Sequence, residues 1–434
     1  MATDPRAIVD REAMSPFQWG VVAIMVGLNA LDGFDVLSIS FASPGIAKAW
    51  GIDRAALGVV LSMELIGMAL GSIVLGGVAD RIGRRRTILG CLVVMATGMF
   101  AASTAHDVTT LSLWRVLTGL GIGGMLAATN AAVAEVSNAA RRNFCVVIMA
   151  GGYPVGAIIG GSISAALLKR FDWPVVFQFG AIATLCFIPL VLWRAPESIA
   201  FQMKQRSADA LAAINRTLGR MGHGAVDAMP AESGTVAGVP LARLFSPALV
   251  RLTILLTLAY LAHIMTFYFI LKWIPKIVVD MGFAASAAAG VLVWANVGGA
   301  SGSLLLGLLT AKMRVRTLTM VVMAFSAVLI AIFGRGQADL SQLAIVAAAA
   351  GFFTNAGVVG LYALLAQSFP TEVRATATGF AIGVGRGGSA LAPALAGFLF
   401  AAGYGLQTVA ILMAMGSVVA LLALLALGNK TVAG

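Results

Sequence analysis

The sequence predicts an all-α membrane protein with twelve transmembrane helices in two six-helix bundles. Three observations lead to this fold class. Hydrophobic residues make up 60% of the 434 residues and charged residues only 11%, whereas a soluble globular chain carries about a quarter charged residues. The hydrophobic residues gather in twelve runs, each long enough for a spanning helix, which needs about 20 mainly apolar residues. A polar stretch divides these runs into six and six.

The spans end where charged or turn-forming residues replace the apolar ones. They form an expected N-terminal bundle (residues 1–194), a cytoplasmic linker (195–248) and a C-terminal bundle (249–434). An amphipathic helix is expected within the linker, near residues 199–218. The polar N-terminus is not expected to be a signal peptide, because the apolar run after it is too long and no processing site follows. The expected spans are residues 17–42, 56–79, 87–106, 110–136, 143–168, 173–194, 249–278, 285–310, 315–335, 341–367, 374–400 and 404–427.

Lysine and arginine residues set the expected orientation. With the N-terminus inside, twenty of the 29 lie in inside segments and three lie within spans. Because loops rich in lysine and arginine stay on the cytoplasmic side, we expect both termini in the cytoplasm and the protein in the inner (cell) membrane. The six in outside loops are Lys48, Arg54, Lys169, Arg170, Lys276 and Arg335.

Several function classes are excluded by what the sequence lacks. It has no Walker loop, no nucleophile elbow and no histidine pair at metal spacing, so we expect no ATP-driven pump, no enzyme, no cofactor and no metal site. The net charge of +11 lies in clusters between apolar runs, which is typical of membrane topology and not of a nucleic-acid partner. The three cysteines are expected to pack within apolar spans. The bilayer is an expected partner, and a monomer is the expected functional unit.

A charged loop joins the second and third spans. Residues 76–86 read Gly-Gly-Val-Ala-Asp-Arg-Ile-Gly-Arg-Arg-Arg. The glycines allow a tight turn, and Asp80 can accept bonds from a helix N-terminus or from an arginine. Such a cluster can hold two helices in one conformation and release them in another. The alternative is a plain positive-inside anchor, which would need neither the aspartate nor the glycines. A shorter basic loop at residues 312–316 suggests that the two halves are parallel repeats.

Two carboxylic acids lie inside the first span. Asp32 and Asp35 are three residues apart and therefore share one helix face. Both cannot ionise cheaply in a low-dielectric environment, so one is expected to hold and release a proton. This chemistry suits proton coupling. Arg115 in the fourth span lies at nearly the same depth, so the alternative is that the acids merely pair with a cation.

These features resemble the major facilitator superfamily and, within it, the aromatic acid:proton symporter family. The resemblance covers essentially the whole chain. It implies inward transport of benzoate-type acids, hydroxybenzoates, muconates or related ring-cleavage products together with protons, by a fold that rocks around a central site. Its marks are Asp-Gly-Phe-Asp at 32–35, Ser-Pro at 43–44, the charged loop at 76–86, Arg-Val-Leu-Thr-Gly-Leu-Gly at 115–121, Thr-Glu-Val-Arg at 371–374 and Gly-Val-Gly-Arg-Gly-Gly at 383–388.

The resemblance also assigns expected roles to single residues. It implies that Asp32 and Asp35, with Arg115, form the proton-coupling group, and that Arg386 is the family's helix-eleven arginine. It matches Glu135 to the family's helix-four glutamate. Glu135 lies 20 residues beyond Arg115, roughly 30 Å along a helix, so it cannot meet that arginine. We therefore expect a cytoplasmic gate made by Asp80, Arg81, Arg84 and Glu135; the alternative for Glu135 is an exposed interface residue.

Arg386 is the expected anchor for the substrate. It lies near the middle of the eleventh span among glycines, and a guanidinium fork suits an anionic ligand in a partly apolar cavity. The alternative is a structural arginine bonded to backbone carbonyls.

Lys272 and Glu64 depart from the family pattern, which has small residues near both points. Lys272 lies toward the outer end of the seventh span, where it would either add a second cation for a carboxylate or extend to the membrane surface. Glu64 in the second span would pair with Lys272, pair with Arg386 or transfer protons.

The remaining expected substrate contacts lie in the C-terminal half. His263 is either a hydrogen-bonded packing group or a site residue. A ring with a carboxylate would suit an aromatic and polar wall in spans that line this half of the fold. The expected wall residues are Tyr268, Trp294, Asn296, Asn355 and Tyr362.

The leading hypothesis is a proton-coupled symporter that imports an aromatic or related small organic carboxylate by alternating access. One alternative is a transporter of the same fold for another solute, such as a sugar, working in uptake or efflux. Another is a transporter-like receptor, which would be expected to carry a long soluble tail.

Overall fold

The computed structural model describes residues 4–205, 209–229, 240–310 and 312–428. Twelve of its helices are long and apolar enough to cross a membrane. The predicted fold class is therefore confirmed, and the chain is a multi-pass membrane protein.

Six of these helices form the N-terminal bundle. Helices α3 and α5 pack most extensively, followed by α2 against α6. Glycines allow the close approach of α3 and α5: a Cβ atom on Gly67 would lie 2.2 Å from the Val116 carbonyl oxygen, and one on Gly119 would lie 2.1 Å from that of Glu64. This contact places Glu64 beside Arg115. The helices are α2 (Pro16–Trp50), α3 (Arg54–Ile82), α4 (Arg84–Ser103), α5 (Val108–Val136), α6 (Arg142–Leu167) and α7 (Pro174–Arg194).

The other six helices form the C-terminal bundle. Helices α11 and α13 pack through Gly298 and Gly351, where an added Cβ would lie within 2.0 Å of a carbonyl oxygen on the facing helix. Helix α10 lies between α14 and α15. The helices are α10 (Val250–Asp280), α11 (Ala285–Leu309), α12 (Val315–Phe333), α13 (Leu340–Ser368), α14 (Thr371–Ala401) and α15 (Leu406–Leu427).

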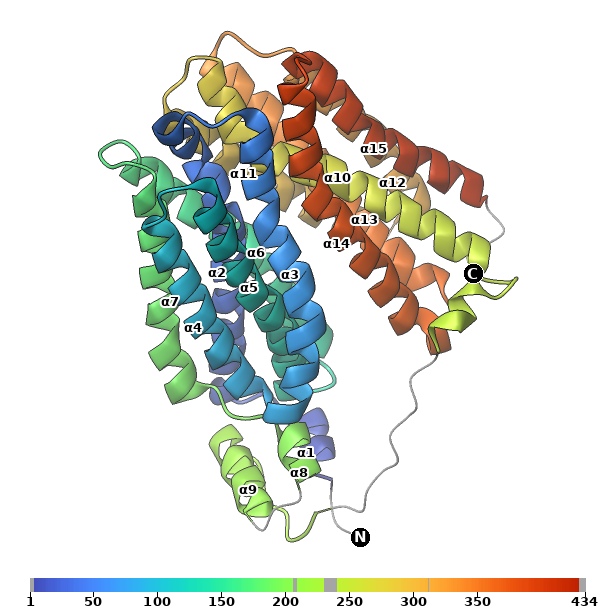
Figure 1. Cartoon of the computed structure of the whole chain (residues 1–434). Coiled ribbons are helices and arrows are strands. Elements are labelled where there is room, and N and C mark those ends of the chain that lie inside the picture. The colour runs from blue at the N-terminus through green and yellow to red at the C-terminus, as the bar shows by residue number, and fades with distance from the viewer. Residues whose placement is uncertain (1–3, 206–208, 230–239, 311, 429–434) are drawn as a thin grey trace.

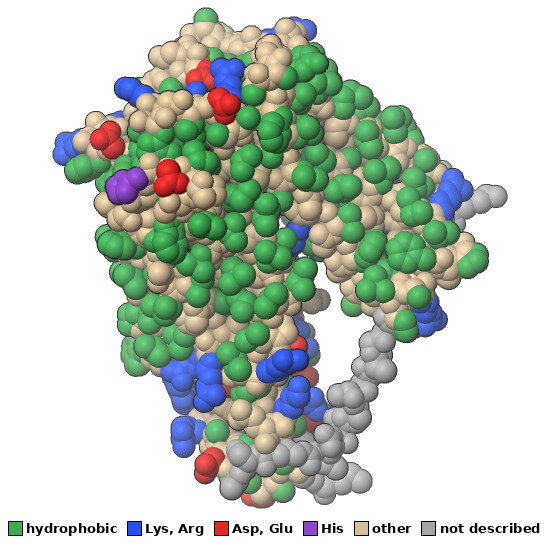
Figure 2. Space-filling model, in the orientation of Figure 1, with side chains coloured by type: hydrophobic (Ala, Val, Ile, Leu, Met, Phe, Trp, Pro, Cys, Tyr) green, Lys and Arg blue, Asp and Glu red, His purple; other side chains and the backbone are tan. Residues whose placement is uncertain are grey.

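The two bundles meet at one end and separate at the other (Figure 1). We call the end that holds Trp50 and Asp280 the far end, and the end that holds α1, α8 and α9 the linker end. At the far end, Arg54 and Asp280 form an ion pair of 2.9 Å between the bundles, and an added Cβ on Gly58 would lie 3.0 Å from the Cα atom of Gly397. Toward the linker end a wide hollow separates the bundles (Figure 2). The structure is therefore closed at the far end and open at the linker end.

Short helices cover the linker end of the N-terminal bundle. They are α1 (Pro5–Arg11), α8 (Ile199–Gln205) and α9 (Ala210–Met221), and a 3-10 turn, η1 (Leu241–Phe245), precedes α10. The single amphipathic helix expected at 199–218 is thus two helices, with residues 206–208 outside the described part. Helix α1 was not predicted.

Helix α2 is longer than its expected span of 17–42. The prediction ended the span where the apolar run ends, but the helix continues to Trp50 and stops at Gly51, whose φ of 60° is left-handed. A helix can extend beyond the apolar segment that spans the membrane and end where a left-handed glycine caps it.

Candidate functional site

A buried group of charged side chains lies between the bundles. Glu64 on α3 forms ion pairs with Arg115 on α5 and, at 3.4 Å, with Lys272 on α10. All three side chains are completely buried. Lys272 belongs to the C-terminal bundle, so one carboxylate binds one cation from each bundle.

Further contacts satisfy the two cations. Arg115 donates to the main-chain oxygen of Asp35 at 3.0 Å and approaches the sulfur of Met99, and its guanidinium lies 5.2 Å from the ring centre of Phe177. Lys272 donates to the main-chain oxygen of Val36. Buried charges persist only when their hydrogen-bonding groups find such partners, so removing any one member would leave a buried charge without its partner.

Asp32 and Asp35 lie beside this group, and no hydrogen-bond donor of the described residues reaches their carboxyl oxygens. Both side chains are buried. Arg115 reaches the backbone of Asp35, but its ion pair is with Glu64. Counting residues along the helices thus predicted correctly that Arg115 lies near these acids. It did not predict that Arg115 forms its ion pair with Glu64. Glycines on both helices let α3 and α5 approach closely enough for this pair, but the glycines in the sequence do not show which helices meet.

Arg386 on α14 reaches across to the N-terminal bundle. Its side chain is half-buried, and within the described residues it makes one hydrogen bond, from Nη1 to the Met68 carbonyl oxygen of α3 at 3.2 Å. Gly383 and Gly387 are exposed, with no atom within 4 Å of an added Cβ. The guanidinium thus retains donors for a ligand, next to open space.

Tyrosines lie near Arg386. The ring of Tyr260 packs against Gly385, the residue before Arg386, where an added Cβ would lie 2.1 Å from the ring. The hydroxyls of Tyr260 and Tyr362 lie 3.1 Å apart. Tyr260 was not among the expected residues, although it lies two helical turns before Tyr268 on α10 and could have been found from that spacing.

His263 does not lie in this site. Its Nδ1 is 3.0 Å from the hydroxyl of Ser417 on α15, its Nε2 is 2.8 Å from the carbonyl oxygen of Thr354 on α13, and the side chain is completely buried. Nine residues separate His263 from Lys272, which is about two and a half turns and places them on opposite faces of α10. Of the two roles weighed from the sequence, these contacts fit the packing group and not the substrate contact.

We therefore expect His263→Leu to lower stability but not substrate recognition. Removing the imidazole leaves the Thr354 carbonyl and the Ser417 hydroxyl with one partner fewer, at a cost of about 1–3 kcal/mol. The melting temperature in detergent should fall, while the KM for uptake should stay within about twofold of the parent's. A KM increase without a stability loss would return His263 to the site.

Trp294 also lies outside the site. Its side chain is 55% exposed, on the face of α11 that carries Leu305, and two residues from Asn296, which is buried on the other side of the helix. A face with exposed large apolar side chains suits contact with lipid. Asn296 donates to its own helix at Leu292, and Asn355 is half-buried against Gly299.

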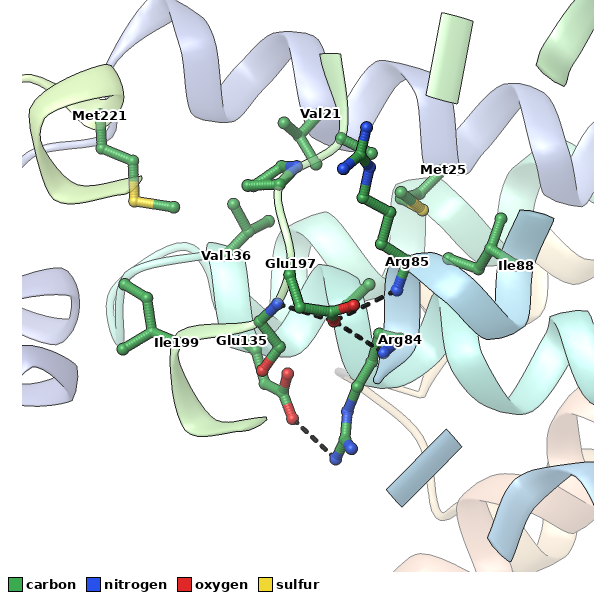
Figure 3. A pocket seen from close by; sticks show the side chains of 14 residues that line it. Val21, Met25, Arg84, Arg85, Ile88, Glu135, Val136, Glu197, Ile199 and Met221 are labelled. Atoms are coloured by element: carbon green, nitrogen blue, oxygen red, sulfur yellow. Dashed lines mark hydrogen bonds and ion pairs between the residues drawn. The ribbon is translucent and has the colours of Figure 1, made fainter. Parts of the chain in front are cut away.

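A second charged group lies at the linker end of the N-terminal bundle (Figure 3). Arg84 pairs with Asp80 at 2.9 Å and with Glu135 at 3.2 Å. Arg81, which was expected to contribute, is exposed and forms no ion pair within the described part of the chain. All these partners belong to one bundle, which agrees with an open linker end.

Glu197 was missed by sequence reasoning. Its carboxylate accepts hydrogen bonds from the backbone N–H groups of Arg84 at 2.7 Å and Arg85 at 3.2 Å, so a linker residue caps helix α4 (Figure 3). Helix α4 begins at Arg84, and its N-cap residue, Gly83, has no side chain that could cap it. The sequence could have indicated that α4 needs a capping residue from another segment, because Gly83 cannot cap it and the first N–H groups of a helix need acceptors.

Comparisons with known proteins agree with this architecture. A family model described as Major Facilitator Superfamily matches residues 25–334. The chain is 28% identical to the gallate transporter of Pseudomonas putida over 98% of this chain and 95% of that protein. It is 31% identical to the 3-(3-hydroxy-phenyl)propionate transporter of Escherichia coli (strain K12), over 92% and 91%. The crystal structure of a D-xylose-proton symporter matches with a TM-score of 0.71 at 16% identity, covering 96% of this chain and 98% of that one; this match concerns the fold alone.

Proposed function

This chain belongs to the Major Facilitator Superfamily and is a transporter, not an enzyme, and we propose that it carries a small aromatic carboxylate together with protons. The named substrates of the two relatives, gallate and 3-(3-hydroxy-phenyl)propionate, each combine an aromatic ring with a carboxylate. We assign the same chemical class to this protein.

The observation that carries proton coupling is the charge balance of the buried group. Arg115 and Lys272 supply two cations, while Glu64, Asp32 and Asp35 supply three carboxyl groups, all of them buried. One excess negative charge in such a place is costly, and a carboxyl that holds one proton removes it. We assign this proton to Asp32 or Asp35, because their oxygens lack donors.

Arg386 and the tyrosines supply the binding surface for the substrate. The guanidinium would bind the carboxylate as a fork, and Tyr260, Tyr268 and Tyr362 would contact the ring. Asn296 and Asn355 remain in the proposal as polar contacts at the edge of this surface.

Transport would follow from the two bundles rocking between two arrangements. The linker end carries the arginine-rich loop at 76–86, so we place it and both termini in the cytoplasm, in the inner membrane. The structure then represents the arrangement open to the inside. Closing that end would bring Asp80, Arg84 and Glu135 toward the C-terminal bundle, as a cytoplasmic gate. The Arg54–Asp280 pair would open at the outside.

The test is uptake into proteoliposomes of a radiolabelled panel: gallate, 3-(3-hydroxyphenyl)propionate, 4-hydroxybenzoate, gentisate, muconate and xylose. An inward proton gradient should drive accumulation of one or more of the acids. Arg386→Ala should raise the KM at least about tenfold, since loss of a charge-assisted bond exceeds about 1.4 kcal/mol. Accumulation of xylose but of no acid, or acid uptake that is indifferent to the gradient and to Arg386, would refute the proposal.

A further inference from the structure

Within the described residues, the polar partners of the Lys272 ammonium group all lie on the opposite bundle. Its ammonium group binds the Glu64 carboxylate at 3.4 Å and the Val36 carbonyl oxygen, and both acceptors belong to the N-terminal bundle. The side chain is completely buried. We expect opening of the far end to separate the bundles at this level as well, because Glu64 lies on α3 ten residues, about 15 Å, beyond Arg54, whose ion pair with Asp280 closes that end.

The separation affects the two partners unequally. Glu64 keeps Arg115, which lies on its own bundle. Lys272 loses both acceptors, and a buried ammonium without an anion costs several kcal/mol. The cation that needs a new partner in that arrangement is therefore Lys272, and it then faces the opened far end.

Arg386 offers a second cation closer to the linker end. Helix α3 provides the scale: Lys272 contacts it at Glu64, and Arg386 contacts it at the Met68 carbonyl oxygen. Four residues separate these points, which is about 6 Å toward the linker end. Both cations lie on the C-terminal bundle, Lys272 on α10 and Arg386 on α14.

We infer that Lys272 is the first anchor for the substrate carboxylate when the far end is open, and that Glu64 displaces the carboxylate toward Arg386 when that end closes. Glu64 is thus an internal competitor of the substrate. This inference rests on the proposed function and adds a path for the substrate. The carboxylate moves from Lys272 to Arg386 when the Glu64–Lys272 ion pair forms again.

The binding test compares neutral variants at the two positions. The probe is whichever acid of the panel the parent accumulates most, measured by equilibrium binding to purified protein. Glu64→Gln should bind it at least about threefold tighter while gradient-driven uptake falls. Lys272→Gln should bind it at least about threefold more weakly, and the double variant should match Lys272→Gln. Asp10→Asn, which removes a carboxylate paired with Arg142, should match the parent.

The sign of the Glu64 effect separates this mechanism from a structural role. If Glu64 only supports the fold, both single variants weaken binding, and that result overturns the inference. Lys272→Gln binding as tightly as the parent overturns it as well. Should Glu64→Gln fold poorly, Glu64→Asp shortens the reach to Lys272 and should shift binding in the same direction.

A second measurement needs no substrate. Ile277 is 4% exposed near the closed far end, so Ile277→Cys can report opening in a background with the exposed Cys186 changed to serine. Adding Glu64→Gln should raise labelling by a membrane-impermeant maleimide several-fold. Unchanged labelling would show that the Glu64–Lys272 contact does not hold the far end closed. If no acid of the panel is accumulated but labelling rises, the proposed substrate class fails while the release of Lys272 stands.

Discussion

Arg115→Met is expected to abolish transport and to destabilise the protein by about 3–5 kcal/mol, the usual cost of removing one partner from a buried ion pair. Arg115 is completely buried and binds both Glu64 and the Asp35 carbonyl oxygen. Without it, Glu64 has Lys272 as its only cation, and the group gains one more uncompensated negative charge. Thermal unfolding in detergent and uptake into proteoliposomes would measure the two effects.

Two variants control this prediction. Arg84→Met removes an arginine whose partners Asp80 and Glu135 are 64% and 25% exposed, and a carboxylate that water can reach costs less to leave unpaired than a fully buried one, so its stability loss should be smaller. Arg115→Met combined with Glu64→Gln should recover part of the lost stability, because the uncompensated carboxylate is then absent. Equal losses for Arg84→Met and Arg115→Met would contradict the view that burial makes this group essential.

Much of the architecture could be predicted from the sequence, because the bilayer imposes a simple rule on apolar runs. The twelve spans and the fold class are confirmed, and the predicted resemblance to aromatic acid transporters agrees with the relatives found. Counting residues along helices also placed Arg115 level with Asp35 and put Glu135 at the other end of α5. Pairing of Glu64 with Lys272 was among the options drawn from the sequence, and the structure contains it.

What escaped prediction depends on how helices face one another. The Arg115–Glu64 pair exists because glycines let α3 and α5 approach backbone to backbone, and no single-helix pattern reveals such a contact. The cap that Glu197 places on α4 joins segments more than a hundred residues apart. His263 and Trp294 are different, since helical periodicity already placed them on faces opposite Lys272 and Asn296. Their assignment to the site followed residue type, whereas their positions favour a packing contact for His263 and a lipid contact for Trp294.

Asp32→Asn is expected to remove accumulation against a gradient while leaving exchange across the membrane. Asparagine keeps the shape of the buried carboxyl but cannot take up and release a proton, so the charge balance of the group no longer changes during the cycle. Substrate contacts at Arg386 are untouched. Gradient-driven uptake should fall at least about tenfold, whereas counterflow of labelled acid against unlabelled acid should stay within about threefold of the parent's.

Ser40→Ala is the matched control, because Ser40 is a buried polar residue on the same helix α2 with no hydrogen-bond partner for its hydroxyl within the described residues and no proton to exchange. It should keep both activities. Asp35→Asn should lose accumulation as well if the two acids share one proton. If only one of the two substitutions uncouples transport, the proton resides on that residue and the other acid balances the cations. If neither does, proton coupling does not depend on this acidic pair, and Glu64 is the remaining carboxyl of the buried group that could carry the proton.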